Sequence, residues 1–240
     1  NKKKKMASWF GWGSNEQTDI IDCLPTPTKE EEYVELLEKK EACLNAWIAN
    51  NNSDTWEEIP FEEHENISLF DHIQMRDEGN VSLIKAIGEL NVEAEQVFKL
   101  VSSSELKTLS TFEQDINSVE HLSQVNQHIT VAHRKYNAPI GVSNREFVVA
   151  RKCIKKDDGS FLVLASSVNV KDKHQSEGYV RGVVIVSAWL IKPQSDTKCT
   201  VYRVAAVDPR GSIPTFIVKL FKTKAAQSIV AIEQVLTNKQ

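Results

Sequence analysis

Two arginines lie on apolar faces of segments whose residues alternate as they do in β-strands. In residues 146–155 the arginine is Arg151, and in residues 200–207 it is Arg203. Their companions on these faces are Phe147, Val149 and Cys153 in the first segment and Val201, Ala205 and Val207 in the second. A charge on such a face is either buried with a partner, or lies at a strand end and reaches solvent. Because a guanidinium group binds phosphate bidentately, anion binding is the chemistry that these side chains could perform.

The other reactive residues show no catalytic or metal-binding pattern. The six histidines have no HxxxH or HExxH spacing, and the sequence holds no GxSxG, P-loop or GxGxxG motif. Glu120 and His133 are the only candidates for a general acid or base, and we expect both at the surface. We therefore predict no enzyme activity, no metal and no cofactor.

Composition is that of an ordinary globular protein. The chain has 240 residues, of which 41% are hydrophobic and 26% charged, and its net charge is -4. Without a basic stripe we expect no nucleic-acid partner, and no apolar run approaches the roughly 20 residues of a membrane span. The four cysteines are widely spaced and no secretory signal is visible, so we expect a cytoplasmic protein with reduced thiols.

The first 27 residues are polar and interrupted by Pro25 and Pro27, and we expect them to form a flexible tail before a domain at 28–240. Residues 1–5 precede Met6, which is a plausible start, and we expect them to be a leader. Trp9, Phe10 and Trp12 could enter a membrane interface, or pack against the domain.

The remaining chain alternates between helical and strand patterns. Thr28 followed by acidic residues predicts the start of a helix that ends near Asn50. A long helix is predicted from Ser212, with Pro214 in its first turn, to about Leu236. Short helices are expected at 92–100 and 102–109, and strands at 56–61, 67–76, 81–90, 118–125, 127–136, 146–155, 161–170, 179–191 and 200–207.

This order predicts an α+β fold with a curved antiparallel sheet of about nine strands. The segments 179–191 and 200–207 are apolar on both faces. A sheet covered by one long helix does not need strands that are apolar on both faces. We therefore expect the sheet to curl around an apolar interior or to pack on a second sheet. A curled sheet that holds a helix encloses a cavity for a small apolar ligand.

Three motifs give the sequence a resemblance to a known family. They are Asn144–Arg151 (NREFVVAR), Gly178–Gly182 (GYVRG) and Asp208–Pro214 (DPRGSIP). In this order and spacing they resemble the START (StAR-related lipid transfer) family over residues 29–236. The resemblance implies a helix-grip fold, in which the sheet wraps the C-terminal helix around a tunnel for one lipid, and lipid exchange between membranes without chemistry. It also implies a gate formed by the C-terminal helix and the loop 137–144.

The resemblance further implies which residues contact the lipid. Arg151 matches a recurring pocket arginine, and Arg203 a tunnel-facing strand position. The residues expected along the tunnel are Arg151, Arg203, Val149, Val183, Ile185, Ser187, Ala205, Val207, Phe216 and Leu220. Cholesterol-type members pair the arginine with an acid on the preceding strand, but residues 127–136 hold no Asp or Glu, so this pair is absent or rebuilt. Choline-binding members carry an aromatic cage where this chain has Ile185 and Ala205.

The prediction is therefore a carrier of one lipid, with a phospholipid favoured over a sterol. We expect a monomer that contacts membranes transiently as a peripheral protein. A lipid-responsive sensor is the alternative, and an enzyme on a related helix-grip fold is a remote one.

Overall fold

The computed structural model describes residues 24–50, 53–72, 82–211 and 215–237, with the side chains of all of these except residues 82 and 215–221. The expected Trp9, Phe10 and Trp12 cluster, most of the expected tail, and the predicted capping residue Ser212 lie outside them. No helix in the described ranges is long and apolar enough to cross a membrane.

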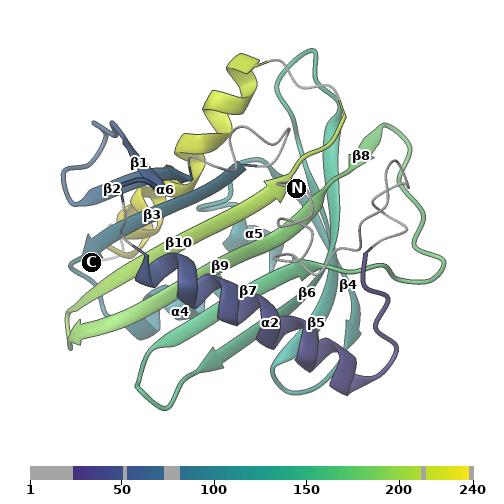
Figure 1. The fold of residues 1–240 in the computed structure, drawn as a ribbon, viewed down its shortest axis with the longest axis horizontal. Coiled ribbons are helices and arrows are strands. Elements are labelled where there is room, and N and C mark those ends of the chain that lie inside the picture. The colour runs from purple at the N-terminus through teal and green to yellow at the C-terminus, as the bar shows by residue number, and fades with distance from the viewer. Residues whose placement is uncertain (1–23, 51–52, 73–81, 212–214, 238–240) are drawn as a thin grey trace.

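The structure is built on one large, mostly antiparallel sheet. Its hydrogen-bonded order is β1-β2-β3-β10-β9-β7-β6-β5-β4, and β8 pairs in parallel with β6. The strands are β1 (Trp56–Ile59), β2 (Ile67–His72), β3 (Ser82–Leu90), β4 (Ile116–Gln124), β5 (Ile129–Tyr136), β6 (Asn144–Lys155), β7 (Phe161–Ser167), β8 (Tyr179–Arg181), β9 (Val183–Ser195) and β10 (Lys198–Asp208). Figure 1 shows the sheet in the order of these strands.

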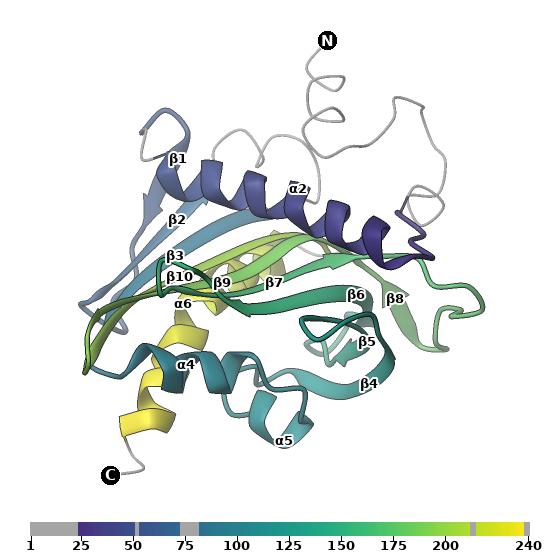
Figure 2. The same ribbon diagram turned by 90° about the horizontal axis from the view of Figure 1, so that it is seen from below.

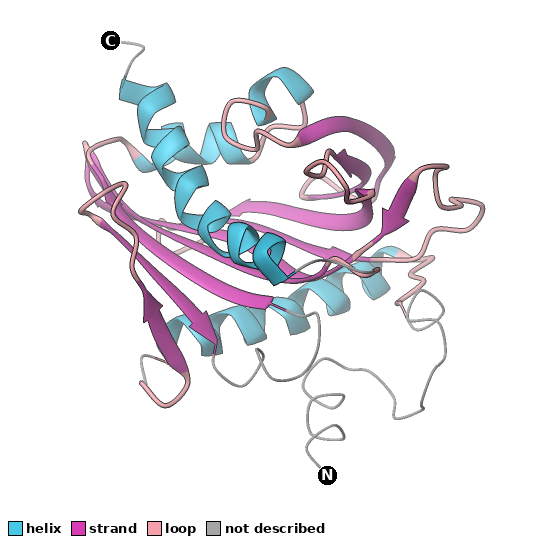
Figure 3. Ribbon diagram, turned by 90° about the horizontal axis from the view of Figure 1, so that it is seen from above, coloured by secondary structure: helices cyan, strands magenta, loops and turns pink. Residues whose placement is uncertain are grey.

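Helices cover both faces of this sheet. They are α2 (Glu30–Ala49), α4 (Ala94–Val101), α5 (Leu106–Leu109) and α6 (Thr215–Thr237). Figure 2 shows α2 on one face and α4, α5 and α6 on the other, toward which the β4–β5 end of the sheet curves. Figure 3 shows α6 lying across this inner face. The predicted α+β helix-grip architecture is confirmed, and α6 is the helix that the sheet holds.

The two covered faces explain why the central strands are apolar on both sides. One apolar core joins the outer face to α2, through residues such as Leu37, Leu44 and Val186. A second joins the inner face to α4 and α6, through residues such as Val97 and Ile229. From the sequence only the long C-terminal helix was expected to cover the sheet, whereas in the structure α2 also buries the opposite face.

The predicted strand 179–191 is two strands, because the chain changes partner at Gly182. β8 pairs with β6, whereas β9 pairs with β7 and β10. A Cβ on Gly182 would lie 2.4 Å from Cε1 of Phe147 and 3.1 Å from the carbonyl oxygen of Asp208. Only glycine permits this approach, and the division gives a sheet of ten strands, in agreement with the expected number of about nine.

A β-bulge in β9 changes which of its side chains face inward. Val207 pairs with Val184 and Ala206 with Val186, so Ile185 is an extra residue on β9. After this point the inward-facing positions continue at Ser187 rather than at Val186.

The start of α2 differs from the sequence prediction, and a glycine on β3 lets α6 pack closely on the sheet. Lys29, not Thr28, is the N-cap of α2, and the Thr28 N–H and hydroxyl donate to the Glu32 carboxylate at 2.6 and 3.3 Å. At the other end of the chain, Gly88 on β3 allows α6 to approach closely, because a Cβ there would lie 2.8 Å from Cγ2 of Ile229.

Candidate functional site

A cavity of about 560 Å³ lies between the inner face of the sheet, α6 and the segment that joins α5 to β4. β6, β7, β9 and β10 contribute Phe147, Val149, Val163, Ala165, Val184, Trp189, Ala205 and Val207. α6 contributes Lys224, Ser228 and Ala231, which recur at the spacing of one helix face. This volume is within the roughly 300–1,000 Å³ of pockets that enclose one small ligand.

The structure brings six of the ten residues expected along the tunnel to this cavity. Val149, Arg151, Ser187, Arg203, Ala205 and Val207 all line the cavity. Val183 and Ile185 do not, and both pack in the outer core against α2. The bulge in β9 is the reason, because it puts Val184 inward in place of its two neighbours. Phe216 and Leu220 fall in α6, where their side chains are outside the described ones.

Arg151 is buried, and its guanidinium group caps a helix. Nη1 donates to the carbonyl of Ser103 at 3.1 Å, and Nη2 donates to the carbonyl of Val101. Val101 is the last residue of α4, so these bonds satisfy carbonyls that the helix leaves without partners. Burial lowers the pKa of Arg151. Two of the three guanidinium nitrogens of Arg151 thus bind carbonyls at the end of α4 and hold this helix on the sheet.

More of the guanidinium group faces the cavity in Arg203 than in Arg151. Nη1 donates to the carbonyls of Val204 and Ala188 at 2.8 and 3.3 Å. The group lies over the Trp189 ring, 4.8 Å from its centroid, in a cation–π contact. Among the residues that the structure describes, Nε and Nη2 of Arg203 donate to no partner and Arg203 forms no ion pair with an acid. Burial lowers the pKa of Arg203, as expected for a cation held away from water.

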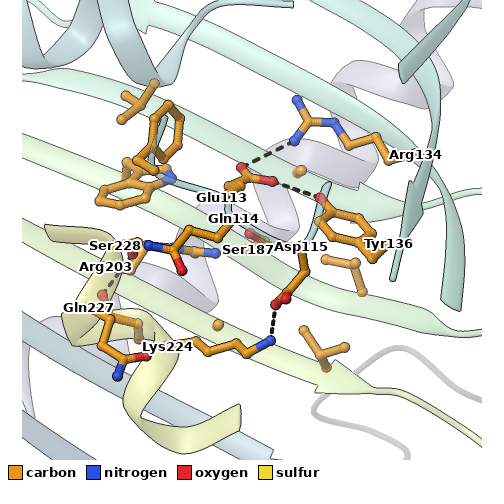
Figure 4. Close-up of a pocket in the computed structure, with 18 of the residues that line it drawn as sticks. Glu113, Gln114, Asp115, Arg134, Tyr136, Ser187, Arg203, Lys224, Gln227 and Ser228 are labelled. Carbon is orange, nitrogen blue, oxygen red and sulfur yellow. Dashed lines mark hydrogen bonds and ion pairs between the residues drawn. The ribbon is translucent and has the colours of Figure 1, made fainter. Parts of the chain in front are cut away.

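A third arginine forms the acid–arginine pair that the sequence did not reveal. Arg134 on β5 lies 3.4 Å from Oε1 of Glu113, and the Tyr136 hydroxyl donates to Oε2 of Glu113 at 2.8 Å. Figure 4 shows the Glu113 carboxylate directed toward both side chains. Burial raises the pKa of Tyr136, which keeps the phenol protonated as a donor. The family pattern places such an acid on the strand before Arg151, within residues 127–136, whereas Glu113 comes from the segment between α5 and β4.

These groups act on one another across the cavity. Burial lowers the pKa values of Arg151 and Arg203, and the charge of Glu113 raises both against that effect. Glu113 therefore lies within electrostatic reach of three arginines. Since it is a single carboxylate among Arg134, Arg151 and Arg203, the inner part of the cavity carries an excess of positive charge.

The cavity meets solvent beside a second ion pair. Lys224 on α6 pairs with Asp115, and both side chains are about 40% exposed, at 39% and 43%. Exposed cavity residues nearby are Gln114, Asn137 and Gln227. The rim is thus formed by the segment that carries Glu113, the loop after β5 and α6. This loop is part of the expected gate, and Gly141 within it has a positive φ of 87°.

The three sequence motifs converge next to this rim. Arg145 donates to the carbonyls of Pro209 and Arg210 at 2.8 and 2.9 Å. Glu146 is fully buried and accepts from Arg181 Nε at 2.8 Å. Burial alone would raise the pKa of Glu146, but hydrogen bonds from Ser176 and Arg181 hold it at about 2. The motifs therefore brace the end of the sheet around the cavity.

His133 and Glu120, the candidate acid and base, lie on the outer face. His133 is only 2% exposed, so the surface placement predicted for it is wrong, whereas the Glu120 side chain is 55% exposed. His133 Nε2 lies 3.0 Å from the Glu146 carboxylate and Nδ1 lies 3.3 Å from Glu120. Neither residue reaches the cavity, and within the described ranges no group of three potential metal ligands gathers.

Comparison with known proteins agrees with this architecture. A sequence model described as the START domain matches residues 38–231. No curated protein matches the chain. Human StAR-related lipid transfer protein 5 superposes with a TM-score of 0.76 at 16% identity, over 87% of this chain and 98% of that one. Human STARD10 gives 0.69 at 16% identity, over 82% and 78%, and a StAR-related lipid transfer protein fragment from Xanthomonas axonopodis gives 0.62 at 21%, over 77% and 99%.

Proposed function

Because the chain belongs to the START domain family, we propose that it binds one lipid in this cavity and carries it between membranes. START domains bind lipid ligands. The observation that carries the proposal is the cavity itself, with about 560 Å³ of space, apolar side chains from four strands and a rim open to solvent. The likenesses to solved structures concern the fold, and the name of each describes only that protein.

The energetics of lipid burial favour a carrier that opens at a membrane. Each CH₂ group removed from water contributes roughly 0.8 kcal/mol, so an acyl chain contributes on the order of 10 kcal/mol. A ligand held this strongly leaves slowly through water, and exchange requires the rim beside Lys224 and Asp115 to open against a bilayer. The protein then acts from the cytoplasm as a monomer in transient contact with membranes, and residues 28–240 form its lipid-binding unit.

The charges of the cavity favour a phospholipid. Arg203 presents Nε and Nη2 to the interior without an acidic partner among the described residues, and phosphate is the group that such a fork binds best. Arg151 adds positive charge next to the same space, although two of its nitrogens are occupied by α4. A phosphate on the ligand would neutralise part of the excess positive charge. The protein performs no chemistry on this ligand.

Native mass spectrometry and vesicle transfer test this function together. The purified protein should retain one co-purified lipid, and its phosphate should be visible in the mass of the released ligand. The protein should also accelerate transfer of a fluorescent phospholipid from donor to acceptor vesicles. Absence of acceleration with every lipid class would overturn the carrier function, and lipid binding without transfer would indicate a sensor.

A sterol is the second candidate, favoured by the pair of Glu113 and Arg134. Such a pair can bind one hydroxyl group as both acceptor and donor. In this case the same mass spectrum would contain a sterol, and removal of Arg203 would leave uptake unchanged.

A further inference from the structure

The polar groups of the cavity divide into two kinds. Arg203 and Arg151 present cationic donors, whereas the group of Glu113 and Tyr136 presents acceptors. Figure 4 shows both kinds facing the same space, with Glu113 and Tyr136 on one wall and Arg203 on another. A ligand that satisfies both kinds needs an anionic group and a hydrogen-bond donor.

The geometry of Glu113 leaves its carboxylate with unused acceptor capacity. Oε1 faces Arg134 and Oε2 accepts the Tyr136 hydroxyl, and each carboxylate oxygen can accept a second hydrogen bond. The Tyr136 hydroxyl donates to Glu113 and interacts with Arg134, so the unused acceptor capacity lies on the Glu113 carboxylate. The Glu113 side chain is 21% exposed and lines the cavity, so a ligand can reach it.

The position of this acceptor group is fixed. The Tyr136 ring packs edge-on against Phe147 with ring centroids 5.7 Å apart, and Arg134 holds the other carboxylate oxygen. Glu113 and Arg203 both line this one cavity, so a single head group can contact both (Figure 4). A bare phosphate ester would offer no donor to the remaining acceptor positions of Glu113 and would bring two anions together.

We propose that Glu113 selects lipids whose head group carries hydroxyl groups beside its single negative charge, a polyol phosphodiester. This inference rests on the proposed phospholipid function and adds a rule for the head group. The phosphodiester lies at Arg203, and a head-group hydroxyl donates to the Glu113 carboxylate. A lipid of the same charge without a hydroxyl fills the cavity but leaves the remaining acceptor positions of the Glu113 carboxylate without a donor and shielded from water.

The test compares two lipids that differ only in these hydroxyl groups. Vesicles of phosphatidylcholine contain either phosphatidylglycerol or phosphatidylpropanol with the same acyl chains, and uptake is measured by native mass spectrometry and by competition with a fluorescent lipid. A hydrogen bond to a charged group is worth about 1.5–3 kcal/mol, so the wild-type protein should prefer phosphatidylglycerol about 10- to 100-fold. In Glu113→Gln the preference should fall below about 3-fold, since the charged acceptor is lost.

The control is Glu120→Gln, which removes an acid from the outer face of the sheet. Glu120 does not reach the cavity, so this variant should keep the preference of the wild type. Equal uptake of the two lipids by the wild-type protein overturns the selection by Glu113 and leaves the phospholipid function standing. Uptake of neither lipid overturns both. Because the wild-type comparison needs no substitution, the test does not depend on the folding of any variant.

Discussion

Replacing Arg203 by methionine separates a ligand-binding arginine from a structural one. Arg203 has two guanidinium nitrogens that face the cavity without a partner among the described residues, whereas two nitrogens of Arg151 hold the end of α4. We therefore expect Arg203→Met to reduce phospholipid affinity and Arg151→Met to reduce stability. Methionine fills much of the arginine stem's volume, so each change removes mainly the charge and its hydrogen bonds.

The magnitudes follow from the contacts that each side chain makes. Arg203→Met loses a cation–π contact with Trp189 worth about 1 kcal/mol, and gains a similar amount because a poorly solvated charge is removed. The carbonyls of Ala188 and Val204 belong to strands that are paired on both edges, so they keep backbone partners. The free energy of unfolding should change by less than about 1 kcal/mol. Loss of a charge-assisted bond to phosphate should weaken lipid binding about 10- to 100-fold.

Denaturant unfolding and lipid uptake from phosphatidylglycerol-containing vesicles measure the two effects. The matched variant Arg151→Met leaves two carbonyls at the end of α4 without their donor, and should lose about 1–3 kcal/mol of stability with a smaller change in uptake. The reasoning is refuted if Arg203→Met unfolds more easily by more than about 3 kcal/mol, or if it takes up phospholipid as the wild type does.

Three further predictions concern pH, packing and the rim of the cavity. The pKa of Glu146 is about 2 in the folded protein against an ordinary value of 4.5, so its ionised form stabilises the fold above pH 4.5, and this contribution disappears as the pH falls toward 2. Glu146→Gln should therefore lose about 3 kcal/mol at neutral pH and weaken the dependence on pH seen by circular dichroism, and an unchanged acid transition would contradict this. Gly182→Ala places a Cβ 2.4 Å from Phe147 and should lower the free energy of unfolding in urea by about 1–3 kcal/mol. An unfolding midpoint equal to that of the wild type would show that the Phe147 ring moves aside freely. Asp115→Asn breaks the ion pair with Lys224, which should change stability by less than about 1 kcal/mol but accelerate lipid exchange at low salt, and this difference should vanish at high salt. Equal exchange rates at low salt would exclude the pair as a constraint on opening.

The elements and the inward-facing strand residues could be predicted because they depend on local patterns. Alternation placed Arg151 and Val149 on the cavity side of β6, and helical spacing identified α6. Val183 and Ile185 were misplaced because a bulge depends on how neighbouring strands pair, which a period of two residues does not encode. His133 was expected at the surface, and its burial depends on Glu146 and on the packing around it.

The sequence by itself determined that the chain forms a curved sheet holding a C-terminal helix, because residue periodicity and three motifs with fixed spacing specify it. It also placed Arg151 and Arg203 on apolar faces of two strands. Tertiary structure alone decided how those arginines are used, since each partner comes from a distant segment. Arg151 is directed to the end of α4 and Arg134 to Glu113, while Arg203 is left with nitrogens open to the cavity. Such pairings arise when the folded chain brings separate carbonyls and carboxylates within hydrogen-bonding distance, and no local pattern records them.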